Sequence, residues 1–296
     1  MNAPPPWQPS VLDPIPAVAR YLVFDPRIGL DPRPALARVR DTFSPAGSVI
    51  GLGQPLVLAL AAEIAGLRSF PPLCGPAVAF PSTQGGLWAF IGGSDPGDVH
   101  DRARSLRAAL GEGFLVREEV SAFKYRDGRD LTGFEDGTEN PKEDLAVAAA
   151  IVSGRGTGLD GSSFVATQRY VHDLDGVARL PHASRDEVIG RGLETNEELA
   201  NAPPSAHVKR TAQESFDPPA FLVRRSMPWG GAFDHGLYFV AYGESLGRFE
   251  RVLARMTGSV DGIVDRLLSF TRAVTGGYYW CPPMRSGKID LRAVGV

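Results

Sequence analysis

The chain has 296 residues, a net charge of −3 at neutral pH and a pI near 6.0. This slightly acidic balance argues against a nucleic-acid partner, which normally requires a basic surface. Hydrophobic residues make up 43% of the chain and charged residues 22%, which predicts a globular protein of about two domains. The two cysteines, Cys74 and Cys281, stand far apart, so a disulfide framework and a Cys-x-x-Cys metal site are excluded.

Residues 1–16 are rich in proline and lack the basic, apolar and small-residue order of a secretion signal, so we expect an extended N-terminal arm. The most apolar run, residues 56–67, is too short to span a bilayer and contains Glu63. We therefore expect a soluble, cytoplasmic protein with no membrane contact.

Apolar runs and helix-start residues predict the elements of the first half of the chain. Ser94 and Asp95, for example, mark the start of a helix. The predicted order is strand 17–24, helix 34–43, strand 48–52, helix 56–67, strand 86–93, helix 95–110 and strand 114–125.

The second half repeats this order, with strand 161–171, helix 185–200, strands 220–225 and 236–245, and helix 246–257. Gly86-Leu-Trp-Ala-Phe-Ile-Gly-Gly93 and Gly236-Leu-Tyr-Phe-Val-Ala-Tyr-Gly243 are similar strands 150 positions apart, each followed by an arginine-rich amphipathic helix. This spacing indicates a duplicated unit. We predict an α+β fold of two tandem ferredoxin-like domains, with antiparallel sheets covered by helices. The expected boundaries are an arm at 1–16, an N-terminal domain at 17–142 and a C-terminal domain at 143–296.

The segment Leu131-Thr-Gly-Phe-Glu-Asp-Gly-Thr-Glu-Asn-Pro141 lies between the two units. Gly133 and Gly137 on either side of Asp136 allow positive φ angles and a close approach of the backbone to a bound group. The segment is either an interdomain turn whose acidic residues face water or a loop that presents Asp136 to a site.

Among the five histidines, no pair has the close spacing of a zinc site, and neither a Gly-x-Ser-x-Gly motif nor a phosphate-binding Walker loop occurs. His207 stands out because it follows a polar, proline-containing segment and precedes an apolar strand with two arginines. An arginine on such a strand costs free energy unless an anion pairs with it. Either Arg224 or Arg225 therefore marks a site, or one faces solvent while the other pairs with a carboxylate.

Gly133-Phe-Glu-Asp-Gly137, followed by Thr138-Glu-Asn-Pro141, resembles the Gly-x-x-Asp-Gly motif of dye-decolorizing peroxidases. Ala206-His207, Val223–Gly230 and Val274–Tyr279 resemble later blocks of the bacterial B-type branch, in the family's order and over roughly the whole chain. The resemblance implies a pair of ferredoxin-like domains, in agreement with the repeat. It also implies one non-covalent haem b per chain in the C-terminal half, with hydrogen peroxide as oxidant.

Carried over to matching positions, the resemblance makes His207 the axial ligand of the haem iron. Asp136 would move a proton between the peroxide oxygens, and Arg224 would stabilise the departing oxygen. Ser226 stands where many B-type members have asparagine, and its hydroxyl would take part on the same side of the haem.

The remaining positions concern cofactor binding. Gly137 belongs to the matched motif, and Arg191 resembles an arginine that binds a haem propionate. Asp265 resembles the carboxylate that accepts the other N–H of the axial histidine, which makes the imidazole more electron-donating. The alternative for Asp265 is an aspartate on a helix surface.

The resemblance implies a peroxidase that works through a ferryl intermediate and oxidises bulky aromatic donors such as dyes, phenols or porphyrinogens. The alternative is a haem-handling or haem-storage protein with incidental peroxidase activity. Residues 278–280 (Tyr-Tyr-Trp) either relay electrons to the surface or pack in the core. Some relatives are homo-oligomers or carry a C-terminal tag for an encapsulin shell. We expect homo-oligomers here, and we interpret residues 288–296 as an ordinary terminus.

Overall fold

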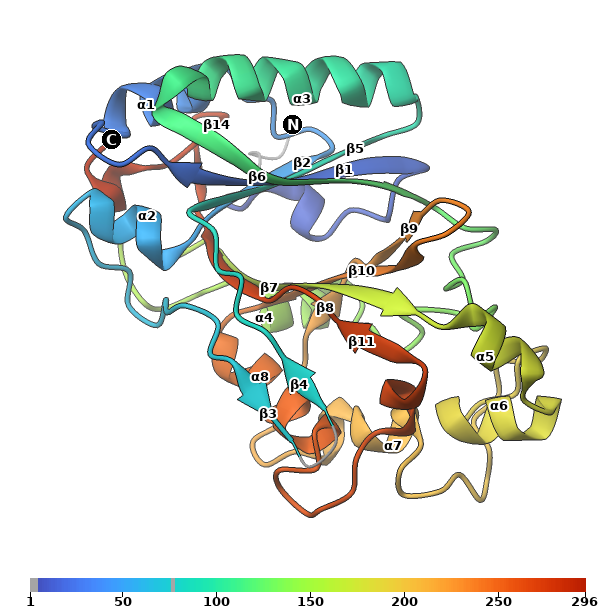
Figure 1. Cartoon of the computed structure of the whole chain (residues 1–296). Coiled ribbons are helices and arrows are strands. Elements are labelled where there is room, and N and C mark those ends of the chain that lie inside the picture. The colour runs from blue at the N-terminus through green and yellow to red at the C-terminus, as the bar shows by residue number, and fades with distance from the viewer. Residues whose placement is uncertain (1–4, 76–77) are drawn as a thin grey trace.

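The structure is a computed structural model that describes residues 5–75 and 78–296. Two antiparallel sheets face each other, and helices cover their outer faces (Figure 1). Each half of the chain supplies one of these two layers. In the part of the chain that the structure describes, no helix has both the length and the apolar character needed to cross a membrane.

The N-terminal half folds as strand, helix, two strands, helix and strand. Its strands lie in the order β2-β5-β1-β6, which is the order of a ferredoxin-like sheet. Helices α1 and α3 cover the outer face, as Figure 1 shows at the top. The bounds are β1 Val18–Pro26, α1 Arg33–Thr42, β2 Ser48–Leu52, α2 Gln54–Ala59, β5 Leu87–Gly93, α3 Pro96–Leu110 and β6 Phe114–Phe123.

The C-terminal half repeats the same strand order, β12-β7-β10-β8. The similar strands of the sequence repeat, β5 and β10, hold the same place in each sheet, and α3 and α8 follow them. The prediction of two ferredoxin-like domains is therefore confirmed. The bounds are β7 Ser163–His172, β8 Val223–Arg224, β10 His235–Gly243, α8 Leu246–Met256 and β12 Gly277–Cys281.

The two sheets also join at their edges. Trp280 on β12 pairs with Leu52 on β2, and Ala122 on β6 pairs with Trp229 on β9. The remaining elements are β3 Leu73–Cys74, β4 Ala79–Phe80, α4 Glu143–Ala150, α5 Leu174–Arg179, α6 His182–Ile189, α7 His207–Arg210, β9 Met227–Gly230, β11 Thr271–Ala273, β13 Met284–Arg285 and β14 Lys288–Ile289.

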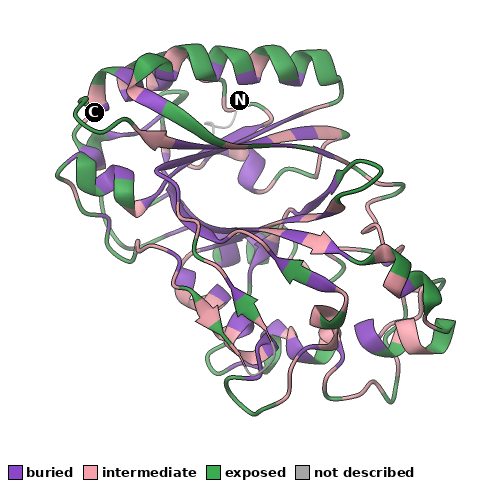
Figure 2. Ribbon diagram, viewed as in Figure 1, coloured by how far each residue is buried: buried purple, intermediate pink, exposed green. Residues whose placement is uncertain are grey.

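Alternation along the strands separates two apolar cores. The inner core fills the space between the sheets and is rich in aromatic rings, where Tyr21 and Tyr238 stack with centroids 3.9 Å apart. Trp88 Nε1 donates a hydrogen bond to the Tyr238 hydroxyl at 3.2 Å. The outer core lies beneath the helices. Figure 2 shows buried residues along both sheets. The large apolar surface between the sheets holds the two halves together.

The two halves differ in the connection between their first and second strands. In the N-terminal half, residues 27–47 make this connection and place α1 on the sheet. In the C-terminal half, residues 173–222 make it, with the short helices α5, α6 and α7. These helices lie away from the sheet, at the bottom and right of Figure 1. The outer face of the C-terminal sheet therefore has α8 packed on it and a space where a second long helix would lie.

Several predicted boundaries are wrong. The predicted helix 56–67 ends at Ala59, and Ala61 and Gly66 have positive φ angles of 53° and 88° that a helix cannot contain. The predicted helix 185–200 covers 182–189 and ends at Gly190, whose φ of 90° forms a left-handed C-cap. The predicted strand 220–225 shrinks to Val223–Arg224.

The N-terminal arm is only partly extended. Residues 1–4 lie outside the described residues, and Pro9–Val11 form a 3₁₀ turn. Gln8 is buried, and its amide bonds to Ile50 through both the backbone N–H and the carbonyl. The arm is therefore packed against β2.

Candidate functional site

The space on the outer face of the C-terminal sheet contains a cavity of about 130 Å³. Strands β7, β8 and β10 form one wall, and α7 and α8 contribute to the others. A second cavity of about 170 Å³ adjoins it and shares Asp136, His207 and Arg224. Three residues from distant parts of the sequence, all named as candidates by the sequence analysis, therefore line both cavities.

His207 is the first residue of α7, and a buried carboxylate fixes its ring. Its Nδ1 lies 2.8 Å from Asp265 Oδ2, and the Asp265 side chain has no solvent exposure. The other oxygen, Oδ1, accepts the Leu267 N–H at 2.9 Å. Because the carboxylate is buried, the alternative of an exposed aspartate is wrong. A carboxylate at Nδ1 favours a proton there, which leaves the Nε2 lone pair available to a ligand.

Asp136 lies in the loop that joins the two halves and contributes to both cavities. Desolvation raises the pKa of its carboxyl, and the nearby Arg224 guanidinium opposes this shift. Asp130 raises the pKa further, while the Gly137 N–H and His207 lower it. The physical result is a carboxylate that holds a proton more readily than an exposed aspartate does.

Gly137, which was predicted to be near the cofactor, lines the second cavity and has a φ of 74°. A Cβ at this position would lie 2.9 Å from Asn140 Nδ2, so glycine is required both for the conformation and for the space. This turn directs Asp136 toward the cavity.

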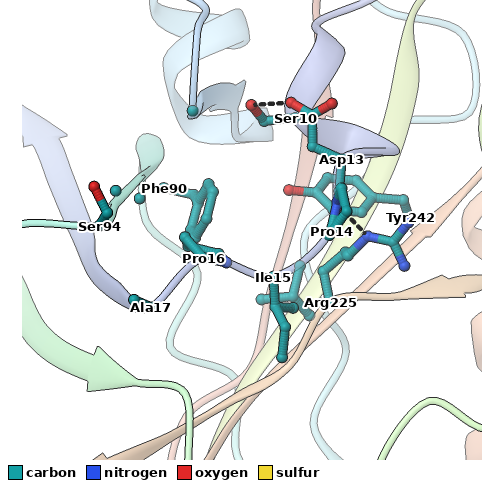
Figure 3. Close-up of a pocket in the computed structure, with 14 residues that line it drawn as sticks. Ser10, Asp13, Pro14, Ile15, Pro16, Ala17, Phe90, Ser94, Arg225 and Tyr242 are labelled. Atoms are coloured by element: carbon teal, nitrogen blue, oxygen red, sulfur yellow. Dashed lines mark hydrogen bonds between the residues drawn. The ribbon is translucent and has the colours of Figure 1, made fainter. Parts of the chain in front are cut away.

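Arg224 and Arg225 point to opposite faces of the sheet, as alternation requires. Arg224 lines both cavities with His207, and its buried Nε has no hydrogen-bond partner among the described residues. Arg225 instead reaches a different cavity of about 330 Å³ beside Asp13 and Tyr242 (Figure 3). There its Nε donates to the Asp13 carbonyl and its Nη2 to the Leu12 carbonyl, both at 2.7 Å. Arg225 therefore anchors the N-terminal arm.

Asn140 is a residue of the site that the sequence did not suggest as such. Its Oδ1 accepts the Arg224 N–H at 2.8 Å, and its Nδ2 donates to the Arg224 carbonyl at 2.9 Å. The side chain thus pairs with β8 as a neighbouring strand would, and it holds the Asp136 loop against Arg224. The only signal in the sequence was its place before Pro141, which indicated a turn.

Arg191 lines the second cavity and is largely buried. Its guanidinium contacts the Glu139 carboxylate and donates to the Asn196 carbonyl at 2.9 Å. Ser226, in contrast, is not among the residues that line either cavity. Its hydroxyl is buried and lies 3.3 Å from the Val240 N–H, which donates to it. The structure therefore does not bring Ser226 together with Asp136 and Arg224.

A second histidine–aspartate pair lies in the first cavity and was not predicted. His172 Nε2 is 3.1 Å from Asp130, and its Nδ1 is 2.7 Å from the Thr271 hydroxyl. Because both ring nitrogens have partners, His172 has no free nitrogen to offer a metal. Burial raises the pKa of Asp130, but the hydrogen bond from His172 and those from Thr132 outweigh it and hold the pKa below its usual value. The negative charge of Asp130 is one reason for the raised pKa of Asp136.

Residues 127–286, more than half of the chain, match the family model described as the C-terminal part of Dyp-type peroxidases. The chain belongs to the Dyp-type peroxidase family. The matched region contains every residue of the site described above.

Among curated relatives, the dye-decolorizing peroxidase of Mycobacterium tuberculosis is 33% identical over 222 residues, which are 73% of this chain. A dye-decolorizing peroxidase of Mycolicibacterium paratuberculosis is 34% identical over 222 residues. These matches span 66% and 63% of the relatives' own lengths, just under two thirds.

Among solved structures, DyPB from Rhodococcus jostii RHA1 is similar with a TM-score of 0.84 and 29% identity, covering 92% of this chain and 94% of that one. A dye-decolorizing protein from V. cholerae has a TM-score of 0.81 and 30% identity, covering 96% of this chain and 98% of that one. A variant of the Rhodococcus DypB was solved in complex with heme. The family's fold is thus shared over nearly the whole chain.

The pairing of Asn140 with β8 gives a first testable prediction. Asn140→Ala removes two hydrogen bonds that connect the Asp136 loop to Arg224. We expect the free energy of unfolding to fall by about 1–3 kcal/mol, since each such bond contributes about 1 kcal/mol. Urea unfolding of the purified variant measures this change.

The exposed Asn201, for which the structure records no side-chain hydrogen bond, provides the matched control. Asn201→Ala should change stability by less than about 0.5 kcal/mol. Equal effects of the two substitutions would show that the Asn140 pairing contributes nothing.

Proposed function

We propose that this protein is a peroxidase that carries one non-covalent haem b per chain, reduces hydrogen peroxide and oxidises bulky aromatic donors such as dyes, phenols or porphyrinogens. One observation carries this proposal. A histidine held by a buried carboxylate shares a cavity with an unpaired arginine and a carboxylate of raised pKa. The heme in the related DypB variant supports the choice of cofactor.

The residues around the cavity fit a haem. Its walls are mainly apolar, as a porphyrin requires, with Phe239, Phe249 and Leu253 among them. His207 offers one nitrogen ligand, and the porphyrin itself would supply the others. The Arg224 Nε without a partner suits a bound anion or peroxide oxygen. Arg191 at the more polar second cavity could exchange Glu139 for a propionate.

The proposed roles follow from position and charge. When bound, haem would supply the iron site for peroxide and, from iron and porphyrin together, the two electrons that break the O–O bond. Asp136 would accept a proton from one peroxide oxygen and return it to the other, which leaves as water. Arg224 keeps a fixed positive charge in a cavity of low dielectric, where it would stabilise the negative charge that develops on the departing oxygen. Asp265 would keep His207 oriented and electron-rich.

A haem-handling or haem-storage protein is the second candidate, and the structure offers a reason to rank it lower. A carrier needs a ligand and an apolar cavity, which His207 and the cavity walls provide. It has no need of an arginine whose buried Nε lacks a partner among the described residues, nor of a carboxylate of raised pKa beside it, since both cost stability. Asp136 and Arg224 therefore favour an enzyme.

From the resemblance we also propose assembly into homo-oligomers and a cytoplasmic location. Packaging in an encapsulin shell stays the less supported alternative, since we interpret residues 288–296 as an ordinary terminus. Tyr278 and Trp280 lie in the outer core, and Tyr279 lies in the inner core. This burial favours the packing interpretation of the three aromatic residues. Ser226 stays a prediction, since its side chain lies outside both cavities.

The first prediction of this section concerns haem binding. The protein expressed with adequate iron should show a Soret band and release haem b into acidified organic solvent. His207→Ala should lose most of the haem or alter its ferric spectrum, because the nitrogen ligand is gone. The exposed His100 and His182 serve as controls, and their alanine variants should match the wild type. A native ferric spectrum in His207→Ala would exclude the ligand assignment.

The second prediction concerns pH. Asp136 must be ionised to accept a proton, so the rate of the peroxide-induced spectral change should fall as pH drops through its pKa. Because desolvation raises this pKa, the fall should begin at a higher pH than for an ordinary aspartate. Stopped-flow rates of wild type and Asp136→Asn from pH 4 to 8 test this, since the variant should be slow and lack the transition. If the rate of Asp136→Asn still fell at low pH as the wild-type rate does, another residue would be the base.

The third prediction separates the enzyme from the carrier. Arg224→Leu should keep its haem and react with peroxide about 10²–10³ times more slowly, the usual effect of removing one positioned donor. Arg225→Leu should slow the reaction by no more than a few-fold, because Arg225 faces the other cavity (Figure 3). Small and equal effects of both substitutions would favour the carrier.

A further inference from the structure

Gln168 is a buried polar side chain at the site, and the proposed roles assign it no function. It lies in the middle of β7, is 1% exposed and lines the first cavity. Its Oε1 accepts a hydrogen bond from the Tyr170 hydroxyl at 2.9 Å. Its Nε2 has no partner among the described residues.

A buried donor without a partner costs about 1–3 kcal/mol and is rare in folded proteins. At the wall of a cavity, such a donor is placed to bind a molecule or an ordered water. In this arrangement the Tyr170 hydroxyl donates to Oε1, which leaves Nε2 on the side of the cavity. The amide is thereby presented to the cavity as a donor.

Strand register places Gln168 on the same wall as Arg224. Ala241 on β10 pairs with Arg224 on one side and with Ala166 on the other, and Phe239 pairs with Gln168. Gln168 and Arg224 are thus two strands apart and offset by two residues, roughly 12 Å between Cα atoms from ordinary sheet spacings. Both are long side chains on one face of the sheet. Each has a buried nitrogen without a hydrogen-bond partner.

This wall lies across the cavity from α7, which carries His207 at its first position. A small molecule bound on the sheet side of a haem would therefore meet donors from two directions. Ser226, whose hydroxyl was expected to take the role of a further hydrogen-bonding group on this side of the haem, accepts the Val240 N–H and is not among the residues that line either cavity. The amide of Gln168 is free for that role.

We propose that Gln168 is a third catalytic residue, whose Nε2 donates a hydrogen bond to peroxide on the same side of the haem as Arg224. This inference rests on the proposed peroxidase function. A neutral amide does not titrate, so its contribution is the same at every pH at which the protein is folded. It complements Asp136, which accepts a proton, and Arg224, which supplies charge.

The test uses fluoride as a probe on the haem-loaded ferric protein. Fluoride bound to ferric haem accepts hydrogen bonds from neighbouring donors, and its affinity is measured from the visible spectrum without turnover. Gln168→Leu should weaken fluoride binding about 3- to 10-fold, the value of one neutral hydrogen bond. The ratio to wild type should stay constant with pH. Peroxide reaction should slow by a similar factor.

Two further variants sharpen the test. Gln168→Met keeps the length of the side chain without the donor and should behave like Gln168→Leu. Arg225→Leu, at the other cavity, should leave fluoride affinity unchanged. Wild-type affinity and rate in both Gln168 variants would overturn the proposal, as would an equal weakening in Arg225→Leu. Loss of haem in both Gln168 variants would also overturn it, because the amide would then serve the haem itself.

The wild-type protein distinguishes this failure from failure of the proposed function. If wild type binds no haem, or its haem does not react with peroxide, the peroxidase proposal fails first. If wild type reacts and the Gln168 variants match it, only the role of Gln168 is excluded.

Discussion

The site depends on keeping charged and amide side chains on a sheet face that apolar residues otherwise cover. Burying such groups without partners costs free energy, so the surrounding structure must hold them in place. Arg224 lies on a strand of two residues that would be too short to fix it alone. Its backbone is paired on one side with Ala241 and on the other with the Asn140 side chain. The arginine is therefore positioned by both halves of the chain.

The duplicated architecture explains where the space for the site comes from. Both halves have the same strand order, but only the N-terminal half uses the connection between its first two strands to cover the sheet. In the C-terminal half this connection is longer and carries His207 away from the sheet. The stability lost on this face is offset by the inner core between the sheets, where Tyr21, Trp88 and Tyr238 are fully buried. The stability that the inner core provides thus allows the outer face of the C-terminal sheet to lack a second covering helix.

The sequence predicted most of the fold because the two units repeat at a constant offset and their strands alternate regularly. It predicted poorly where the C-terminal half departs from the repeat. The helix expected at 185–200 ends at Gly190, and the segment after it is held by contacts such as that of Arg191 with Glu139. Such contacts join residues far apart in the chain and leave no local pattern.

The same reasoning applies to the site. The sequence motifs identified Asp136, His207 and Arg224, which the structure brings together around one cavity. Asn140 and His172 were not identified, because each acts through a contact with a distant segment. Gln168 was not identified because a single amide on an apolar strand gives no local signal that it borders a cavity. The resemblance also suggested Ser226, two residues after Arg224. β8 and β9 keep one register against β10, which assigns Ser226 to the face of Arg224, but its hydroxyl accepts the Val240 N–H and Ser226 does not line either cavity.

The pKa of Asp136 depends on several neighbouring groups together, and no single residue determines it. Desolvation raises its pKa, Arg224 lowers it and Asp130 raises it again. Asp130 can stay ionised beside Asp136 because His172 and Thr132 donate hydrogen bonds to it. If Asp130 were protonated, its charge would vanish and Asp136 would become a weaker base. The His172–Asp130 pair would therefore act on the proposed chemistry without contact with the reacting atoms, and it ties the basicity of the loop to the end of β7. The raised pKa of Asp136 is thus a property of the folded site, built in part from residues that the sequence motif alone does not contain.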